Sequence, residues 1–246
     1  MDPIADFEVV ETELMLADLE SLDKRKAGVE KKAKSGDKDA KAQVALIDLA
    51  LAELNEGRPA RKANVPKDET RAWNMLQLLT SKPVLFVANV DEDSAATGNA
   101  HSERVMARAK EEDAGCVVFS AQIESELALL DDADRAEYLE TLGLEEPGLT
   151  RLIHSGYDLL NLQTYFTVGP KEARAWTIRR GWTAPKAAGV IHGDFEKGFI
   201  RAETIAYSDF VANGGEAGAK EAGKMRAEGK EYIVQDGDVL HFRFNV

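Results

Sequence analysis

A short stretch, KPVLFVANVDED over residues 82–93, places an amide and acidic side chains directly after an apolar segment. Val84 to Ala88 has the continuous apolar character of a buried strand, and Asn89-Val90-Asp91-Glu92 follows it at once. Further along, a second apolar run, Cys116 to Phe119, leads into Ser120-Ala121. Amide, carboxylate and backbone groups at the ends of two neighbouring strands indicate a pocket for a nucleotide base.

The residue types in this pocket indicate which base it would bind. In P-loop GTPases such a strand ends in N-K-x-D, whose Asp accepts two hydrogen bonds from guanine, and a later S-A offers backbone N–H groups. Here Val90 replaces that Lys and Glu92 replaces that Asp, which weakens selection for guanine. The Asn89 amide can still donate to N7 of adenine and accept from its amino group. We therefore expect Asn89, Val90, Glu92, Ser120 and Ala121 to bind a nucleotide base, with weakened selection for guanine. A plain acidic loop is the alternative.

The region before this pocket is predicted to form a helical hairpin. Apolar residues recur at steps of four and three from Met15 to Ala33 and again from Ala40 to Leu54, which is coiled-coil spacing. Between them, Gly36 suits a C-terminal cap and Asp37 an N-cap. The outer faces are basic with interleaved acids, which favours a solvated surface over a partner-binding tip; the basic residues are Lys24, Arg25, Lys31, Lys32, Lys34, Lys38 and Lys41.

Strand–helix–strand–helix order after residue 81 predicts part of a parallel α/β sheet. The expected helices cover Lys67–Leu79, His101–Asp113 and, approximately, residues 123–130, 133–142 and 149–160. Two strands alone do not make a stable parallel sheet, so we expect further strands on the N-terminal side.

The last third of the chain changes character and predicts a compact α+β module of the β-grasp type. The expected elements are a helix over Ala184–Ile191 and strands over Leu162–Val168, Glu172–Ile178, Phe199–Tyr207, Tyr232–Val234 and Val239–Phe244. Asp236-Gly237-Asp238 is predicted to form the turn between the last two strands and not a metal site.

Several longer segments resemble the Obg-like YchF family of ATPases. They are the Asn-Val-Asp-Glu segment, LGLEEPGL from Leu142, LLNLQTYFTVGPKEARAWTI from Leu159, HGDFEKGFIRAETIAYSDF from His192 and KEAGKMRAEGKEYIVQDGDVLHFRFNV from Lys220. The resemblance implies a P-loop nucleotide-binding domain interrupted by a helical hairpin, followed by a TGS domain of ubiquitin-like fold. It divides the chain into residues 1–80, 81–158 and 159–246. It also implies preference for ATP over GTP, slow Mg²⁺-dependent hydrolysis, and association with ribosomes and RNA.

Part of the family pattern is not found in this sequence. The family has a G-x-x-N-V-G-K-S phosphate loop and a D-x-x-G segment that positions Mg²⁺ and the γ-phosphate, and neither pattern occurs in these 246 residues. We therefore expect an N-terminally truncated chain that keeps base recognition but does not hydrolyse ATP alone. No catalytic or metal-binding residue is predicted, and Mg²⁺ is expected only in a complete family protein.

A basic and aromatic cluster in the tail is the candidate surface for RNA or the ribosome. Its predicted members are Arg174, Arg179, Arg180, Trp182 and Lys186. The alternative is ordinary strand alternation, with aromatics in the core and arginines in water. For the whole chain, the competing function is an adaptor that binds RNA or ribosomes without using a nucleotide.

Composition sets the outer limits of these interpretations. The net charge is −13, but residues from Leu159 onward carry 12 Lys plus Arg against 11 Asp plus Glu, a net of +1. Any RNA affinity of the tail must therefore come from a local cluster. The single cysteine, Cys116, indicates a reducing cytoplasm, and no apolar run is long enough to span a membrane. We expect a cytoplasmic monomer in which Cys116 and the four histidines have structural roles.

Overall fold

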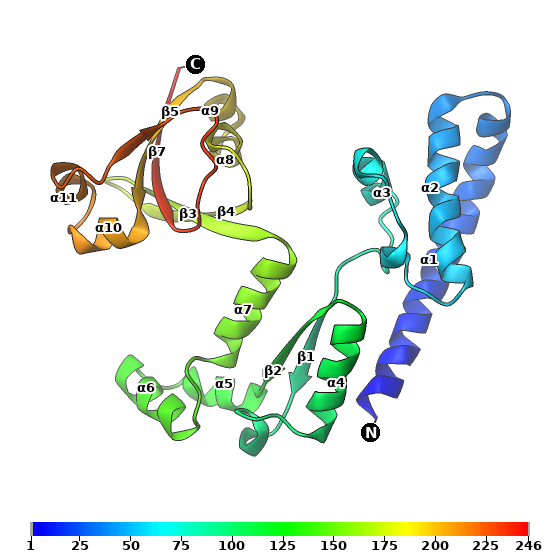
Figure 1. Ribbon diagram of the computed structural model, residues 1–246, viewed down its shortest axis with the longest axis horizontal. Coiled ribbons are helices and arrows are strands. Elements are labelled where there is room, and N and C mark those ends of the chain that lie inside the picture. The colour runs from blue at the N-terminus through cyan, green and yellow to red at the C-terminus, as the bar shows by residue number, and fades with distance from the viewer. Residues whose placement is uncertain (1, 246) are drawn as a thin grey trace. The chain divides into compact units, whose positions relative to one another are not determined.

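The computed structural model describes residues 2–245, which divide into two compact units, the first ending at Ser155 and the second beginning at Gly156 (Figure 1). Within these residues, none of the helices combines the length and the apolar content that crossing a membrane requires.

The first unit begins with the predicted pair of packed helices, α1 (Pro3–Lys34) and α2 (Lys38–Asn55). Gly36 occupies the turn with a φ of 99°, a conformation that suits glycine because it has no Cβ. The Asp37 carboxylate then accepts from the Ala40 N–H and starts α2. The turn between the helices is therefore as the sequence predicts.

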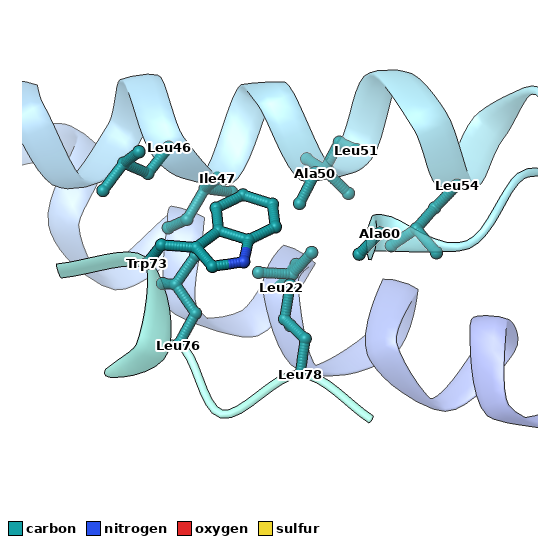
Figure 2. Packing of buried hydrophobic residues seen from close by; sticks show 10 residues of the cluster. All are labelled: Leu22, Leu46, Ile47, Ala50, Leu51, Leu54, Ala60, Trp73, Leu76 and Leu78. Atoms are coloured by element: carbon teal, nitrogen blue, oxygen red, sulfur yellow. The ribbon is translucent and has the colours of Figure 1, made fainter. Parts of the chain in front are cut away.

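An apolar core fills the space between these helices and the chain that follows them. Figure 2 shows the Trp73 indole in this layer, close to Leu22 of α1 and Ile47 of α2. Leu22 and Ile47 have no exposed surface, and Trp73 is 7% exposed. Burial of this apolar stripe is the main force that holds the hairpin together.

The predicted helix over Lys67–Leu79 is wrong in its second half. The structure has short 3₁₀ turns at η1 (Ala60–Lys62) and η2 (Lys67–Glu69), and then only α3 (Thr70–Asn74). Gln77 has a φ of 54°, which breaks the helical path. The backbone N–H groups of Leu79 and Thr80 donate instead to Asp18 on α1. A tertiary contact has therefore replaced helical hydrogen bonds.

Two parallel strands lie at the centre of the remainder of this unit, as the sequence predicts. β1 (Leu85–Asn89) pairs in parallel with β2 (Gly115–Phe119), from Leu85 opposite Gly115 to Asn89 opposite Phe119. The other elements are η3 (Glu92–Ser94), α4 (Ala100–Glu111), α5 (Ala121–Leu127), α6 (Asp132–Thr141) and α7 (Gly148–Leu159). This α/β arrangement is the one expected for part of a P-loop nucleotide-binding fold.

A largely buried ion network joins the hairpin to α4. Arg61 of η1 contacts both Glu11 of α1 and Glu112, which follows α4. Arg108 of α4 contacts Glu112 at 3.0 Å and places its guanidinium over the Phe7 ring. The carboxylates of Glu11 and Glu112 are each 10% exposed. Because each buried charge has an opposite partner, the network fixes the hairpin against the strand-bearing part of the unit.

The second unit is an α+β module around a five-stranded mixed sheet, with strand order β4-β3-β7-β5-β6. β3 and β7 are parallel neighbours, and the other neighbouring pairs are antiparallel. Its elements are β3 (Leu162–Val168), β4 (Ala173–Arg179), α8 (Ala184–Ile191), α9 (Gly193–Lys197), β5 (Phe199–Ala206), α10 (Tyr207–Ala212), α11 (Glu216–Glu221), β6 (Arg226–Glu228) and β7 (Asp238–Phe244).

Separate apolar clusters pack on the sheet of the second unit. One contains Tyr165, Ile178 and Ala187 of α8; the other contains Ile205, Val239 and Ala219 of α11. α10 and α11 were not predicted, because each has only 6 residues, too few to show a helical periodicity.

The predicted strand over Tyr232–Val234 is wrong. This segment makes only one isolated bridge, between Thr183 and Ile233. The Val234 N–H donates to the Trp182 carbonyl, and the Tyr232 hydroxyl donates to Asp238. The segment is therefore held by the residues before α8 and by a side chain, not by a strand partner.

Candidate nucleotide-base site and basic surface

The predicted base-binding residues come together where β1 and β2 end. Because the two strands are parallel, their carboxyl ends meet at one edge of the sheet. The Val90 N–H donates to the Phe119 carbonyl at 2.8 Å, which holds the two loops side by side. Asn89 and Val90 from one loop therefore lie beside Ser120 and Ala121 from the other.

The Asn89 amide is oriented by the opposite loop. Its Oδ1 accepts from the Ala121 N–H at 3.0 Å, and the side chain is otherwise exposed. The amide NH₂ group is then left as a donor toward the space above the strand ends. The Ala121 N–H, expected from the sequence to face the base, instead holds Asn89.

Ser120 contributes a polar atom that the surrounding protein leaves unsatisfied. It is 4% exposed and precedes α5, yet among residues 2–245 its Oγ has no hydrogen-bond partner. Buried hydroxyl groups are normally paired, so the unpaired Ser120 hydroxyl next to the Asn89–Ala121 contact is unusual.

The acidic loop after Asn89 contains two acids with different surroundings. The Asp91 carboxylate accepts from the Ser94 N–H at 3.1 Å and caps η3, which is a structural role. Glu92 is half-buried and faces the Glu126 carboxylate of α5. Burial raises the pKa of the Glu92 carboxyl, and the neighbouring negative charge of Glu126 raises this pKa further.

Two further residues of this neighbourhood were not found by sequence reasoning. The Tyr138 hydroxyl of α6 donates to Glu126 Oε2. That hydrogen bond, followed by burial, raises the pKa of Tyr138 to about 12. Glu126 lies in α5, directly after the predicted Ser120-Ala121 segment, but nothing in the local sequence indicates that its side chain turns toward Glu92.

The described residues were also searched for acidic, histidine and cysteine side chains that lie close enough together to bind a metal ion. Across residues 2–245 there is no group of three or more His, Cys, Asp or Glu side chains that could hold a metal.

The predicted RNA-binding residues do not form one surface. In β4, Arg174 lies two and four positions before Trp176 and the buried Ile178, and therefore on the same face of the strand. Arg179 directly follows Ile178 and lies on the other face. Because side chains alternate across a strand, Arg174 and Arg179 point to opposite faces of the sheet. The Arg174 guanidinium stacks over the Trp176 ring at 4.2 Å from its centroid.

The remaining members of the cluster have partners of their own. Arg180 pairs with Asp158, and the Lys186 ammonium lies 4.3 Å from the centroid of the Trp182 ring. Trp182 is half-buried and packs against the core, so it does not offer the open stacking face expected from the sequence. Arg179 is exposed and makes no ion pair among residues 2–245.

Comparisons with known proteins match this chain to one family along its whole length. Residues 162–245 match the family model YchF-GTPase_C, described as a protein of unknown function (DUF933). The "Ribosome-binding ATPase YchF" of Haemophilus ducreyi is 54% identical over 246 residues, and its namesake from Bacillus subtilis is 50% identical over 248 residues. Each alignment covers 100% of this chain and 68% of the relative. The chain thus spans about two thirds of the length of these relatives.

Solved structures show the same similarity. The YchF GTPase of Schizosaccharomyces pombe matches with a TM-score of 0.83 and 33% identity, covering 98% of this chain and 66% of that one. A GTP-binding protein from Pyrococcus horikoshii OT3 matches with a TM-score of 0.62 over 100% of this chain and 72% of that one. At 19% identity, the second match supports the fold alone.

Proposed function

The chain belongs to the YchF family, and we propose that it recognises the base of ATP, in preference to GTP, and associates with ribosomes. The observation that carries the first part is the pairing of Asn89 Oδ1 with the Ala121 N–H beside the unsatisfied Ser120 hydroxyl. The second part is supported by the relatives, which are named as ribosome-binding ATPases.

Preference for adenine follows from the groups that face the strand ends. The Asn89 NH₂ group would donate to N7, and Val90 supplies an apolar contact where a longer cationic side chain would stand in a guanine site. Both guanine and adenine have N7, so discrimination depends on the opposite edge of the base. We propose that Glu92 contacts that edge.

We assign the domains as residues 1–80 for the helical hairpin and its connection, 81–158 for the nucleotide-binding part and 159–246 for a TGS domain of β-grasp fold. The central parallel pair β3 and β7, with α8 packed on the sheet, supports the β-grasp assignment. The compact units meet at residues 155 and 156, inside α7, close to the proposed boundary at 158.

Ribosome association would use the exposed side of β4 and the turn after it. Arg179 is exposed there, and Arg180 could exchange its exposed Asp158 partner for a phosphate. Trp182 and Lys186 would contribute through their stacked pair, and Arg174 would lie on the other face.

Titration of the ¹⁵N-labelled chain with AMP, followed by amide chemical shifts at Val90 and Ala121, tests the base site. Asn89→Ala should weaken AMP binding by about 1–3 kcal/mol, the range for removing one partner of a polar contact. Asn64→Ala, at an exposed loop position, is the matched control and should bind like the parent. If neither AMP nor ATP shifts any of these amides, the base site is refuted and a nucleotide-independent adaptor is favoured.

A further inference from the structure

The outer edge of β2 borders a polar pocket within the first unit. Among residues 2–245, β2 pairs with β1 alone, so the backbone along its other edge has no strand partner. Residues of the loop after η3, of α4 and of α7 complete the walls of this β2-edge pocket, and its volume is about 420 Å³. Pockets of this size hold small organic molecules. The lining side chains that bear on its chemistry are Thr97, Met106, Val118, Glu146, Arg151 and His154.

Arg151 of α7 carries a positive charge into the β2-edge pocket without a protein partner. The side chain is half-buried, and its Nε is shielded from solvent and has no hydrogen-bond partner. Within the described residues its guanidinium makes no ion pair. The Glu124 carboxylate, near the start of α7, instead accepts from the Gly148 N–H at 2.7 Å. Because a half-buried guanidinium is normally paired, and because its planar donors match a carboxylate, Arg151 indicates a site for an anionic group.

Glu146 gives the same pocket a negative charge that is also unpaired. It is half-buried, and residues 2–245 offer its carboxylate neither an ion pair nor a hydrogen bond. Arg151 and Glu146 therefore line one pocket without neutralising each other. A simple anion would leave Glu146 unpaired, and a simple cation would leave Arg151 unpaired. A ligand with both a carboxylate and an ammonium group can pair with both.

The remaining lining residues indicate the rest of such a ligand. Met106 of α4 is 39% exposed, and with Val118 of β2 it gives the pocket an apolar part. Thr97 and His154 are exposed at the pocket and can hydrogen-bond a carboxylate or an amine. A free amino acid with an apolar side chain combines the two charges and the apolar group that these walls match.

We propose that the β2-edge pocket binds a free amino acid with an apolar side chain, whose carboxylate pairs with Arg151 and whose ammonium group pairs with Glu146. The inference does not rest on the proposed base site or on ribosome association, because none of the residues proposed for either lines this pocket. Its success or failure is therefore independent of both.

Titration of the ¹⁵N-labelled 246-residue chain with L-leucine, up to millimolar concentrations, tests the site through the amide shifts of Thr97, Gly98 and Val118. Two fragments of leucine separate the charges: 4-methylpentanoate lacks the ammonium group, and 3-methylbutylamine lacks the carboxylate. Leucine should bind at least about tenfold more tightly than either fragment, because each fragment loses one charge-assisted contact.

Substitution of the two charged residues assigns each contact. Arg151→Gln should weaken leucine binding by at least about tenfold and should not weaken binding of 3-methylbutylamine. Glu146→Gln should remove the advantage of leucine over 4-methylpentanoate. Lys110→Gln and Glu145→Gln, at exposed positions outside the lining, are the controls and should bind leucine like the parent.

The possible outcomes separate the proposal from its alternatives. If leucine shifts none of these amides in the parent chain, the proposal is overturned. If 4-methylpentanoate binds as tightly as leucine, the pocket accepts a simple anion and the assignment of an amino acid is wrong. The ¹H–¹⁵N spectrum of each free variant distinguishes a lost contact from unfolding. Should Arg151→Gln unfold the chain, the comparison of leucine with its fragments in the parent and in Glu146→Gln still decides.

Discussion

Asp18 is expected to be the most sensitive polar position in the first unit. It lies on α1 and is 3% exposed. Its Oδ1 accepts from the Leu79 N–H at 2.8 Å, and its Oδ2 accepts from the Thr80 N–H at 2.8 Å and the Thr80 hydroxyl at 2.7 Å. The Thr80 Oγ1 in turn accepts from the Ala60 N–H at 3.0 Å. One carboxylate therefore ties the hairpin to the chain that leads into β1.

The size of the effect follows from which donors lose their partner. Replacing Asp18 by Ala leaves three donors without an acceptor, but Leu79 is 41% exposed and water can reach its side of the site. Thr80 is 2% exposed, so its N–H and hydroxyl remain buried and unpaired. At about 1–3 kcal/mol for each of these two buried unsatisfied groups, Asp18→Ala should lower the free energy of unfolding by about 2–6 kcal/mol. Asp18→Asn keeps one oxygen acceptor and should lose roughly half as much.

Urea unfolding followed by far-UV circular dichroism measures this loss. Glu13→Ala, at an exposed position of the same helix, is the control and should change the free energy of unfolding by less than about 0.5 kcal/mol. Hydrogen exchange should become faster in the segment around Leu79 and Thr80 of Asp18→Ala. A loss below about 1 kcal/mol, or unchanged exchange at Thr80, would refute the assignment of this carboxylate as a structural acceptor.

Two other outcomes are expected from the same structure. The 246-residue chain alone should release no phosphate from ATP above a protein-free blank. Phosphoryl transfer depends on a phosphate loop and Mg²⁺ that position the phosphates, and the phosphate-loop pattern does not occur in these residues. Phosphate release that is lost on Glu92→Ala would contradict this. Residues 156–246 should fold alone, since they contain their own sheet and apolar clusters. Arg179→Gln combined with Arg180→Gln should weaken ribosome co-sedimentation and reduce the slope of its salt dependence by up to about two charges. Arg174→Gln, on the opposite face of β4, should change neither. Identical sedimentation of the double variant and the parent at every salt concentration would move the search to the hairpin tip.

Elements with strong local patterns could be predicted closely from the sequence. The helix Ala184–Ile191 and the strand Leu162–Val168 have the predicted bounds, and the parallel pairing of β1 and β2 follows from the order of elements. For the helix and the strand, the residues that define the element are neighbours in the sequence. The side-chain periodicity therefore carries the information.

Elements decided by distant partners could not be predicted in this way. The non-helical segment after α3 is bound at Leu79 and Thr80 by Asp18, which lies more than fifty residues earlier in the chain. The segment around Tyr232 and Val234 has strand-like residues, but its hydrogen bonds go to Trp182 and Asp238. The opposite faces of Arg174 and Arg179, in contrast, could have been predicted from strand alternation alone.

The acidic loop shows why a structural and a functional interpretation of one motif need not exclude each other. From sequence, Asn-Val-Asp-Glu is compatible both with a plain acidic loop and with a base site. In the structure, Asp91 takes the first role, because its carboxylate caps η3 and is satisfied within the loop. Glu92 does not cap the turn and instead faces Glu126, which is itself held by Tyr138. The motif is therefore compatible with two tasks: the first acid fixes the loop, and we propose that the second acid contacts the base.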